Sequence, residues 1–401
     1  MAKKETNKGY LTGREIKAIT KANAKEIKRL EAYKNRKAEE SEFLTEMRDP
    51  RNILEIEDLH TSFFTEQGVV KAVNGVSYDV PKNSVVGVVG ESGCGKSVTS
   101  MSVMRLIQGP SGQIVSGSIR FKAYDYKRDE KGEPIPDGDG FQMEEKIYDI
   151  AKMPIHEIHR IRGKQIAMIF QEPMTSLNPV FTIGEQLDEV TFIHTPGATK
   201  EQAKAKSEEM LRLVGIIPEN VYNAFPHELS GGMRQRVMIA MALAAEPRLI
   251  IADEPTTALD VTIQAQILEL LRDIKNKIDG SILLITHDLG VIAEMADYVV
   301  VMYAGKVIEK GTVYEIFQNP MHPYTIGLQK SKPTMSLDDS SELYNIPGNV
   351  PNPINMPDHC YFKERCAKCT AKCSGEYPGM IQVSPTHFVA CHLYDEEKNN
   401  G

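Results

Sequence analysis

Long apolar runs are absent from this sequence. The longest are short, for example Val85–Val89 and Leu249–Ala252, and none approaches the ~20 apolar residues that a membrane-spanning helix needs. The first ten residues, MAKKETNKGY, lack the apolar segment of a secretory signal. We therefore expect a protein that begins and stays in the cytoplasm, where a membrane-bound partner can hold it.

Excess positive charge and a disulfide-dense cysteine count are also lacking. The net charge is −8, which does not favour binding to a genome. Only six cysteines occur in 401 residues, but five of them fall between residues 360 and 391. With 41% apolar and 25% charged residues the chain has a globular composition, and its length allows about two to three domains.

The first 48 residues differ from the rest of the chain. They hold thirteen Lys or Arg and eight Asp or Glu, and their few apolar residues recur at roughly helical spacing. We expect a thin, charged helix over about Glu15–Arg48 that cannot fold alone. It is either a solvated extension or a helix that binds a partner or an anionic membrane surface.

Strand and helix patterns alternate after Asp49-Pro50, which indicates a parallel sheet covered by helices. A polar segment at about 122–150 interrupts this pattern and predicts a surface loop or hairpin. The chain becomes rich in Pro and Asn after Asn319-Pro320. We therefore divide the chain into an extension at 1–48, a main domain at 51–320 and a third unit at 321–401.

A phosphate-binding loop is predicted at Gly90–Ser97. The segment Gly90-Glu91-Ser92-Gly93-Cys94-Gly95-Lys96-Ser97 follows an apolar strand and opens a helix, which is the context that makes this motif credible. Its backbone N–H groups and the helix N-terminus suit a phosphate. Lys96 is expected to reach the β- and γ-phosphates, and the Ser97 hydroxyl suits Mg²⁺. Cys94 occupies a position that the motif leaves unspecified, so we interpret it as a residue that packs and takes no part in the chemistry.

An acidic pair follows the apolar strand Leu249–Ala252. Asp253 ends this strand, where it can hold Mg²⁺ and its waters, and Glu254 comes next, where it can act on a water that attacks the γ-phosphate. Four further features fit a nucleotide site in this order along the chain: Gln171 after a strand, Ser230-Gly231-Gly232 at a helix start, Asp260 after the acidic strand, and His287 after Ser281–Thr286.

This set of motifs resembles the ATP-binding-cassette ATPase family over roughly residues 53–320. The resemblance implies an α/β fold, with a parallel sheet core, an antiparallel β part and a helical subdomain at about 172–236. It also implies that two cassettes bind ATP head to tail. Gly90–Ser97 and Val98 would bind ATP in this subunit, whereas Ser230, Gly231 and Gly232 would complete the partner's site.

The same resemblance implies individual roles. Gln171 would help to ligate Mg²⁺, Asp253 would hold it through water, Glu254 would polarise the attacking water, and His287 would contact the γ-phosphate. An aromatic residue of the first hairpin would stack on adenine; by spacing this is Phe63, with Phe64 as the rival.

Further segments resemble the narrower family of oligopeptide and dipeptide permease ATPase subunits. They are Phe170–Pro179, Asn319–Thr325, Ile346-Pro347-Gly348 and Cys360–Cys366. This resemblance implies an importer: a second cassette subunit, favoured as a different chain, two membrane permeases, and an extracellular or periplasmic peptide-binding protein that acts indirectly. The expected location is the cytoplasmic face of the membrane. Nickel chelates and glycans are alternative cargoes.

The cysteine cluster suggests a metal site. Disulfides are disfavoured in a cytoplasmic protein, and clustered thiolates suit zinc or an iron–sulfur cluster. Some peptide-permease ATPases carry a four-iron cluster on a frame that Cys360, Cys366, Cys373 and Cys391 reproduce. Cys369 departs from that frame, and His359, His387 and His392 are alternative zinc ligands.

Two other functions were weighed. A soluble cassette ATPase acting on ribosomes or nucleic acid is supported only by the basic N-terminal segment, and net charge and the single cassette oppose it. A redox or sensor protein would need an electron partner, and nothing in the sequence requires one.

Overall fold

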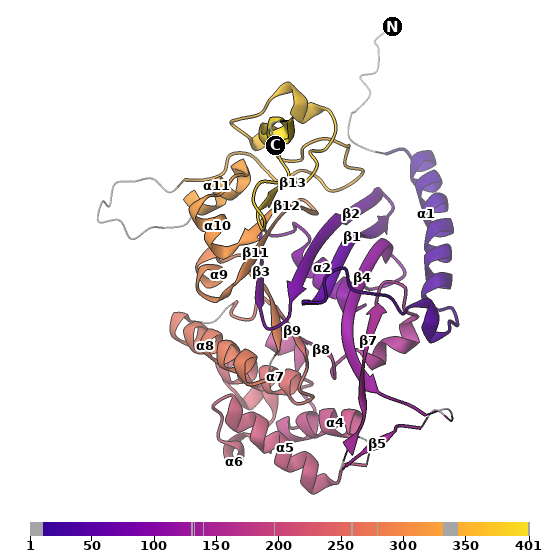
Figure 1. Ribbon diagram of the computed structural model, residues 1–401, viewed down its shortest axis with the longest axis vertical. Helices are drawn as coiled ribbons and strands as arrows, with labels where there is room; N and C mark the ends of the chain where they lie inside the picture. The colour runs from indigo at the N-terminus through magenta and orange to yellow at the C-terminus, as the bar shows by residue number, and fades with distance from the viewer. Residues whose placement is uncertain are drawn as a thin grey trace, which may run out of the picture.

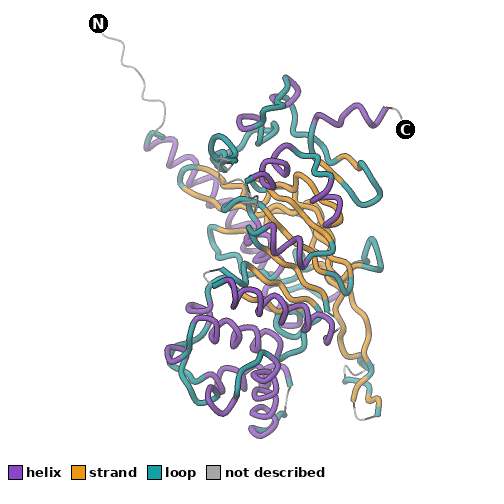
Figure 2. The backbone as a smooth tube through the Cα atoms, turned by 90° about the vertical axis from the view of Figure 1, so that its left-hand side faces the viewer, coloured by secondary structure: helices purple, strands orange, loops and turns teal. Residues whose placement is uncertain are grey.

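The computed structural model describes residues 11–129, 131, 133–138, 140–195, 197–257, 260–278, 280–331 and 344–399. A mixed sheet and an antiparallel sheet form the body of the molecule, and a group of helices extends from one end (Figures 1 and 2). The apolar cores lie on the two sides of the main sheet, because alternate residues of each buried strand face opposite ways. Val85 and Val89 lie in one core, and Val86 and Val88 in the other.

The main sheet confirms the predicted parallel architecture. Five parallel strands lie in the order β8, β9, β10, β3, β11. Their bounds are Ile166–Ile169, Leu249–Asp253, Ser281–Ile285, Val85–Val89 and Tyr298–Tyr303. The sheet continues through the antiparallel strands β12 (Lys306–Thr312), β14 (Phe388–Val389) and β13 (Ile381–Gln382). Strands β3, β9 and β10 are buried throughout, as their continuous apolar sequences require.

The second sheet is antiparallel, in the order β2, β1, β4, β7. Its strands span Gly68–Pro81, Asn52–Thr65, Gly112–Tyr126 and Met143–Asp149. The polar segment predicted at 122–150 is a hairpin here, with β5 (Pro136–Asp137) and β6 (Gly140–Phe141) near its tip. Its last residues are not surface, however, because Tyr148 and Ile150 are buried at the end of β7.

The helices fall into two groups. The first accompanies the main sheet: α2 (Lys96–Val103), α8 (Val261–Ile278), α9 (Leu289–Met295), α10 (Val313–Gln318) and α11 (Pro323–Lys330). The second forms the lower part of Figure 1: α3 (Pro173–Ser176), α4 (Ile183–His194), α5 (Lys200–Leu213), α6 (Pro218–Val221) and α7 (Gly231–Leu243). Thr182 and Thr199 cap α4 and α5 with capping boxes. Among the helices that the structure describes, none combines the length and apolar composition required to span a bilayer.

The N-terminal helix is shorter than predicted. Helix α1 spans Gly13–Lys34, so the expected continuation to Arg48 is wrong. The Asn35 side chain donates a hydrogen bond to the Glu31 carbonyl (2.9 Å) and ends the helix. The helix is also not fully solvated, since Asn23 donates to the Thr65 carbonyl of β1 (2.8 Å).

The segment after α1 belongs to the body of the protein. It includes the short 3₁₀ turn Glu40–Glu42, and then the backbone N–H of Thr45 donates to the Ile147 carbonyl of β7 (2.9 Å). Phe43 is almost completely buried and its ring lies 5.9 Å from that of Tyr148. Residues 35–48 therefore pack against the antiparallel sheet. Their charged composition did not indicate this contact.

The C-terminal segment is likewise continuous with the body. Strands β13 and β14 extend the main sheet beyond β12. Tyr324, Ile346, Tyr361 and Phe362 lie in the same apolar core as β3 and β10. Residues 332–343 of the predicted third unit lie outside the described residues.

We predict that Phe43→Ala lowers the free energy of unfolding by about 3–5 kcal/mol, because it removes a buried ring and leaves a cavity. Leu44→Ala is the matched control, because Leu44 is the next residue and its side chain is exposed. It should change the free energy of unfolding by no more than about 0.5 kcal/mol. Denaturant unfolding of the full chain measures both. Equal effects of the two substitutions would mean that the packing of Phe43 on the antiparallel sheet does not stabilise the fold.

Candidate active site

Four adjacent parallel strands end at one edge of the main sheet and carry the predicted site residues. Strand β3 leads into Gly90, β10 leads to His287, β9 ends at Asp253 and is followed by Glu254, and β8 is followed closely by Gln171. The carboxyl ends of parallel strands in an open α/β sheet are where ligands bind. Four segments that are well separated in sequence thus meet at this edge.

The phosphate loop depends on its glycines. Gly95 has a φ of +101°, and a Cβ atom there would clash with the carbonyl oxygen of Ala72. A Cβ at Gly90 would clash with the carbonyl oxygen of Met302. Glycine at both positions lets the loop pack closely against its neighbours. Helix α2 begins directly after the loop, at Lys96.

Lys96 and Ser97 already make contacts within the site. The Lys96 Nζ is buried and donates to the carbonyl oxygens of Gly90 (2.7 Å) and Glu91 (3.2 Å). The Ser97 Oγ donates to Asp253 Oδ1 at 2.9 Å. Burial raises the pKa of Asp253 to about 6, against the effect of the Ser97 hydrogen bond. Two oxygen groups of the kind that suits Mg²⁺ are therefore neighbours.

Glu254 is the centre of a second group of contacts. Its Oε2 accepts hydrogen bonds from Gln171 Nε2 and from Thr257 Oγ1, both at 2.9 Å. Its Oε1 lies 3.3 Å from His287 Nδ1. The backbone N–H of Glu254 donates to the Ile285 carbonyl (2.8 Å) at a positive φ of +47°. The side chains of Gln171, Thr257 and His287 thus fix the direction of this carboxylate.

A cavity of about 590 Å³ joins these two groups. Of the predicted residues it is lined by Ser92, Gly93, Gly95, Lys96, Ser97, Val98, Gln171, Glu254 and His287, together with Ala72 and Thr257. Cys94 is buried beneath the loop, where burial raises the pKa of its thiol. Phe63 lies in β1, paired with Val70 and Gly112, and does not line this cavity.

The residues assigned to a partner's site lie apart from this cavity. Ser230 is the N-cap of α7, and its Oγ accepts from the N–H of Met233 (3.3 Å). Asp260 Oδ1 accepts from the N–H of Ile263 at the start of α8 (2.9 Å). Ser230, Gly231 and Asp260 are exposed and Gly232 is half-buried, so they can face a second chain. Ala258 and Leu259, which precede Asp260, lie outside the described residues.

Two contacts of the phosphate loop were missed by the sequence analysis. The backbone N–H of Glu91 donates to the Tyr324 hydroxyl (2.8 Å). Arg365 holds the Glu91 carboxylate with two hydrogen bonds, from Nη1 (2.8 Å) and Nη2 (3.0 Å). Arg365 lies between Cys360 and Cys366 in sequence, so the cysteine-bearing segment contacts the phosphate loop directly. Thr257 was also missed, since a threonine after an acidic pair carries no signal of its own.

The cysteine cluster does not form a metal site in the described residues, where no group of three or more His, Cys, Asp or Glu is arranged to hold a metal. The predicted ligands are nevertheless neighbours: the N–H of Cys360 donates to the Cys373 carbonyl (3.2 Å). Burial raises the pKa of the Cys360 and Cys391 thiols to about 11. Cys369 is exposed. The alternative ligands His387 and His392 pair with Glu309 and Asp395.

Two family models match the chain. The ABC transporter model matches residues 73–257, and the model of the oligopeptide/dipeptide transporter C-terminal region matches residues 308–373. The first match contains the phosphate loop and the acidic pair, and the second contains Tyr324 and Arg365.

Curated relatives match most of the chain. The oligopeptide transport ATP-binding protein OppD of Bacillus subtilis is 50% identical over 342 residues, which are 85% of this chain and 88% of the relative. The oligopeptide transport ATP-binding protein AppD of the same organism is 46% identical over 346 residues, which are 86% of this chain and 98% of the relative. The dipeptide transport ATP-binding protein DppD of Lactococcus lactis is 44% identical over 346 residues, which are 86% of this chain and 91% of the relative.

Solved structures agree on the fold. The ATP-binding cassette MJ0796, solved as a dimer bound to ADP and Pi, matches with a TM-score of 0.53 and 22% identity over 65% of this chain and 98% of that one. CbiO1 of Clostridium perfringens, part of the ABC transporter complex CbiONQ, matches with a TM-score of 0.50 and 23% identity over 70% of this chain and 96% of that one. From its motifs, its fold and these relatives, the chain belongs to the ATP-binding proteins of the ABC transporter family that carry the oligopeptide/dipeptide transporter C-terminal region.

Proposed function

We propose that this chain is the ATP-hydrolysing subunit of a membrane importer for oligopeptides or dipeptides. The observation that carries the proposal is the Glu254 carboxylate, held by Gln171, Thr257 and His287 at the edge of the phosphate-loop cavity. The names of the relatives, oligopeptide and dipeptide transport ATP-binding proteins, support the peptide cargo. Together they make the chain a translocase that couples ATP hydrolysis to transport.

Each site residue has a proposed task. The backbone of Gly90–Ser97 and the N-terminus of α2 bind the phosphates of ATP. Lys96 turns from the Gly90 and Glu91 carbonyls to the β- and γ-phosphates. Ser97, Gln171 and Asp253 are the residues that would hold Mg²⁺, which supplies neutralising charge during phosphoryl transfer.

Glu254 orients and polarises the attacking water, and His287 contacts the γ-phosphate. Gln171 donates to Glu254, so a movement of the loop after β8 alters the direction of the catalytic carboxylate. We propose that a permease binds at that loop, so that this contact couples the permease to hydrolysis. Phe63, with Phe64 as its rival, remains the proposed adenine-stacking residue.

The partners follow from the exposed residues at the starts of α7 and α8. Ser230, Gly231, Gly232 and Asp260 complete the nucleotide site of a second cassette subunit, which we propose to be a different chain. Two membrane permeases bind this pair of cassettes, and a peptide-binding protein outside the membrane delivers the cargo. The chain is then a peripheral protein at the cytoplasmic face of the membrane, with no role in nucleic-acid binding.

An iron–sulfur cluster on Cys360, Cys366, Cys373 and Cys391 is supported by their spacing and not by their arrangement, and no step of the proposed reaction runs through it. If the cluster exists, anaerobically purified chain contains iron and acid-labile sulfide in about equal amounts. Cys373→Ser then removes both, whereas Cys369→Ser, at an exposed cysteine outside the frame, leaves them unchanged. Wild-type protein without iron and sulfide would reject the cluster.

We predict that Glu254→Gln slows ATP hydrolysis at least about 100-fold, the scale of a lost general base, while the protein still binds ATP. Phosphate release and binding of radiolabelled ATP by the assembled transporter measure the two effects separately. Glu246→Gln is the matched control, because Glu246 is an exposed glutamate that also has a positive φ (+53°); it should hydrolyse ATP at the wild-type rate. Wild-type hydrolysis by Glu254→Gln would refute the assignment.

A further inference from the structure

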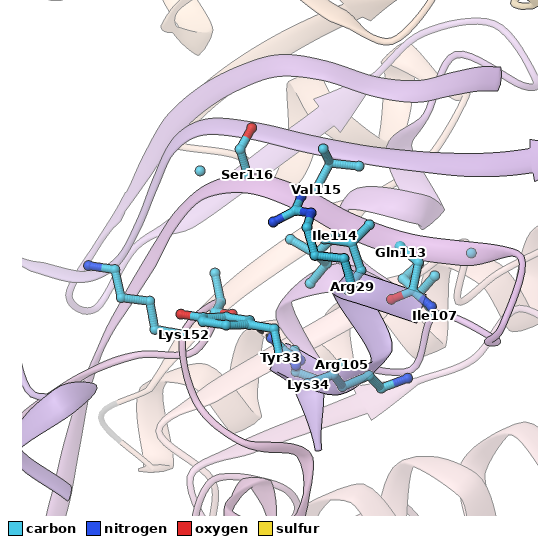
Figure 3. Close-up of a pocket in the computed structure, with 14 residues that line it drawn as sticks. Arg29, Tyr33, Lys34, Arg105, Ile107, Gln113, Ile114, Val115, Ser116 and Lys152 are labelled. Carbon is cyan, nitrogen blue, oxygen red and sulfur yellow. Dashed lines mark hydrogen bonds between the residues drawn. The ribbon is translucent and has the colours of Figure 1, made fainter. Parts of the chain in front are cut away.

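A second cavity lies between the N-terminal helix and the antiparallel sheet, outside the nucleotide site. Its volume is about 230 Å³. Helix α1 forms one wall with Arg29, Leu30, Tyr33 and Lys34, and β4 forms another from Gly112 to Gly117 (Figure 3). Arg105, Ile107, Ala151 and Lys152 complete it. Four of the lining side chains are cationic, in a chain whose net charge is −8.

Arg105 is the most unusual of these cations. It follows α2, the helix that begins at the phosphate loop, and its φ is +53°. Its side chain is buried, and the residue is 9% exposed. Its Nη1 donates to the carbonyl oxygens of Ile150 (3.2 Å) and Ala151 (2.6 Å). Within the described part of the chain, Nε and Nη2 donate no hydrogen bond and the guanidinium has no carboxylate partner.

The other three cations each have a carboxylate beside them. Arg29 pairs with Glu26, Lys34 with Glu31 at 3.7 Å, and Lys152 with Asp149 at 3.1 Å. Among the lining cations of the described residues, Arg105 is therefore the one that forms no ion pair, although the Asp149 carboxylate, which pairs with Lys152, also acts on it from farther away. Burial lowers the pKa of Arg105 to about 10, so the side chain is still cationic at neutral pH. A buried charge without a partner is unfavourable, and an anion in the cavity would relieve that cost.

The lining suggests which anion fits. A guanidinium donates two parallel hydrogen bonds to a phosphate or carboxylate, and lysine ammonium groups add point charges. Lys34 and Lys152 can supply the second charge that a dianion needs. Leu30, Ile107 and Ala151 form an apolar side of the cavity, which suits a short organic body attached to the anionic group. We propose that this cavity binds a small phosphate monoester, either as a free metabolite or as the headgroup of an anionic lipid.

The test is titration calorimetry of the full chain with glycerol 3-phosphate as the probe. The nucleotide site is first saturated with Mg²⁺ and a non-hydrolysable ATP analogue, so that the phosphate loop cannot take up the probe. We expect one site per chain. Arg105→Gln and the double variant Lys34→Ala/Lys152→Ala should each weaken binding about tenfold or more, since each removes cationic hydrogen-bond donors to the phosphate.

Lys28→Ala is the matched control, because Lys28 is an exposed lysine of α1 that does not line the cavity; it should leave the affinity unchanged. The double variant alters half-buried or exposed side chains, so it folds even if Arg105→Gln does not.

Vesicles containing phosphatidic acid distinguish the two sources of the ligand. If the vesicles bind, the double variant abolishes that binding and glycerol 3-phosphate gives no signal, then the ligand is a lipid headgroup. If glycerol 3-phosphate binds, a free metabolite is the ligand. The proposal is overturned if neither probe binds, or if the double variant binds as tightly as the wild type.

Discussion

The shared carboxyl edge of β3, β10, β9 and β8 is the constraint on which the site depends. Each strand is buried and mostly apolar, and each carries residues of the site at its carboxyl end or just beyond it. Parallel pairing in this order brings the phosphate loop, His287, Glu254 and Gln171 to one cavity. The hydrogen bonds to Glu254 then orient the side chain that the proposed reaction uses.

The C-terminal segment contacts the phosphate loop at the same edge. Arg365 holds Glu91 with two charged hydrogen bonds, and Tyr324 accepts from its backbone N–H. Bidentate pairs of this kind are among the stronger polar contacts in proteins. Since β13 and β14 also extend the main sheet, the segment supports the phosphate loop as part of the core and is not an appended unit.

Sequence patterns predicted the features whose signal is local. The phosphate loop, the acidic pair and the apolar strands are continuous in sequence, and the structure has them where they were expected. The features that were missed depend on contacts between distant residues. Nothing near Arg365 indicates that it reaches Glu91, and nothing near Phe43 indicates that it packs on Tyr148.

The N-terminal expectation failed for a physical reason. The charged pattern allowed a helix to Arg48, but the Asn35 side chain caps the helix and the following residues pair with β7. The metal site stays a prediction from cysteine spacing, because spacing does not fix the directions of side chains and the described residues show no group arranged to hold a metal.

The central claim, that this chain powers a permease, is tested most directly by purifying the tagged chain from its native membrane and identifying its partners by mass spectrometry. The account predicts two polytopic membrane proteins and a second cassette subunit in comparable amounts. Ribosomal or nucleic-acid-associated proteins with no permease would contradict it.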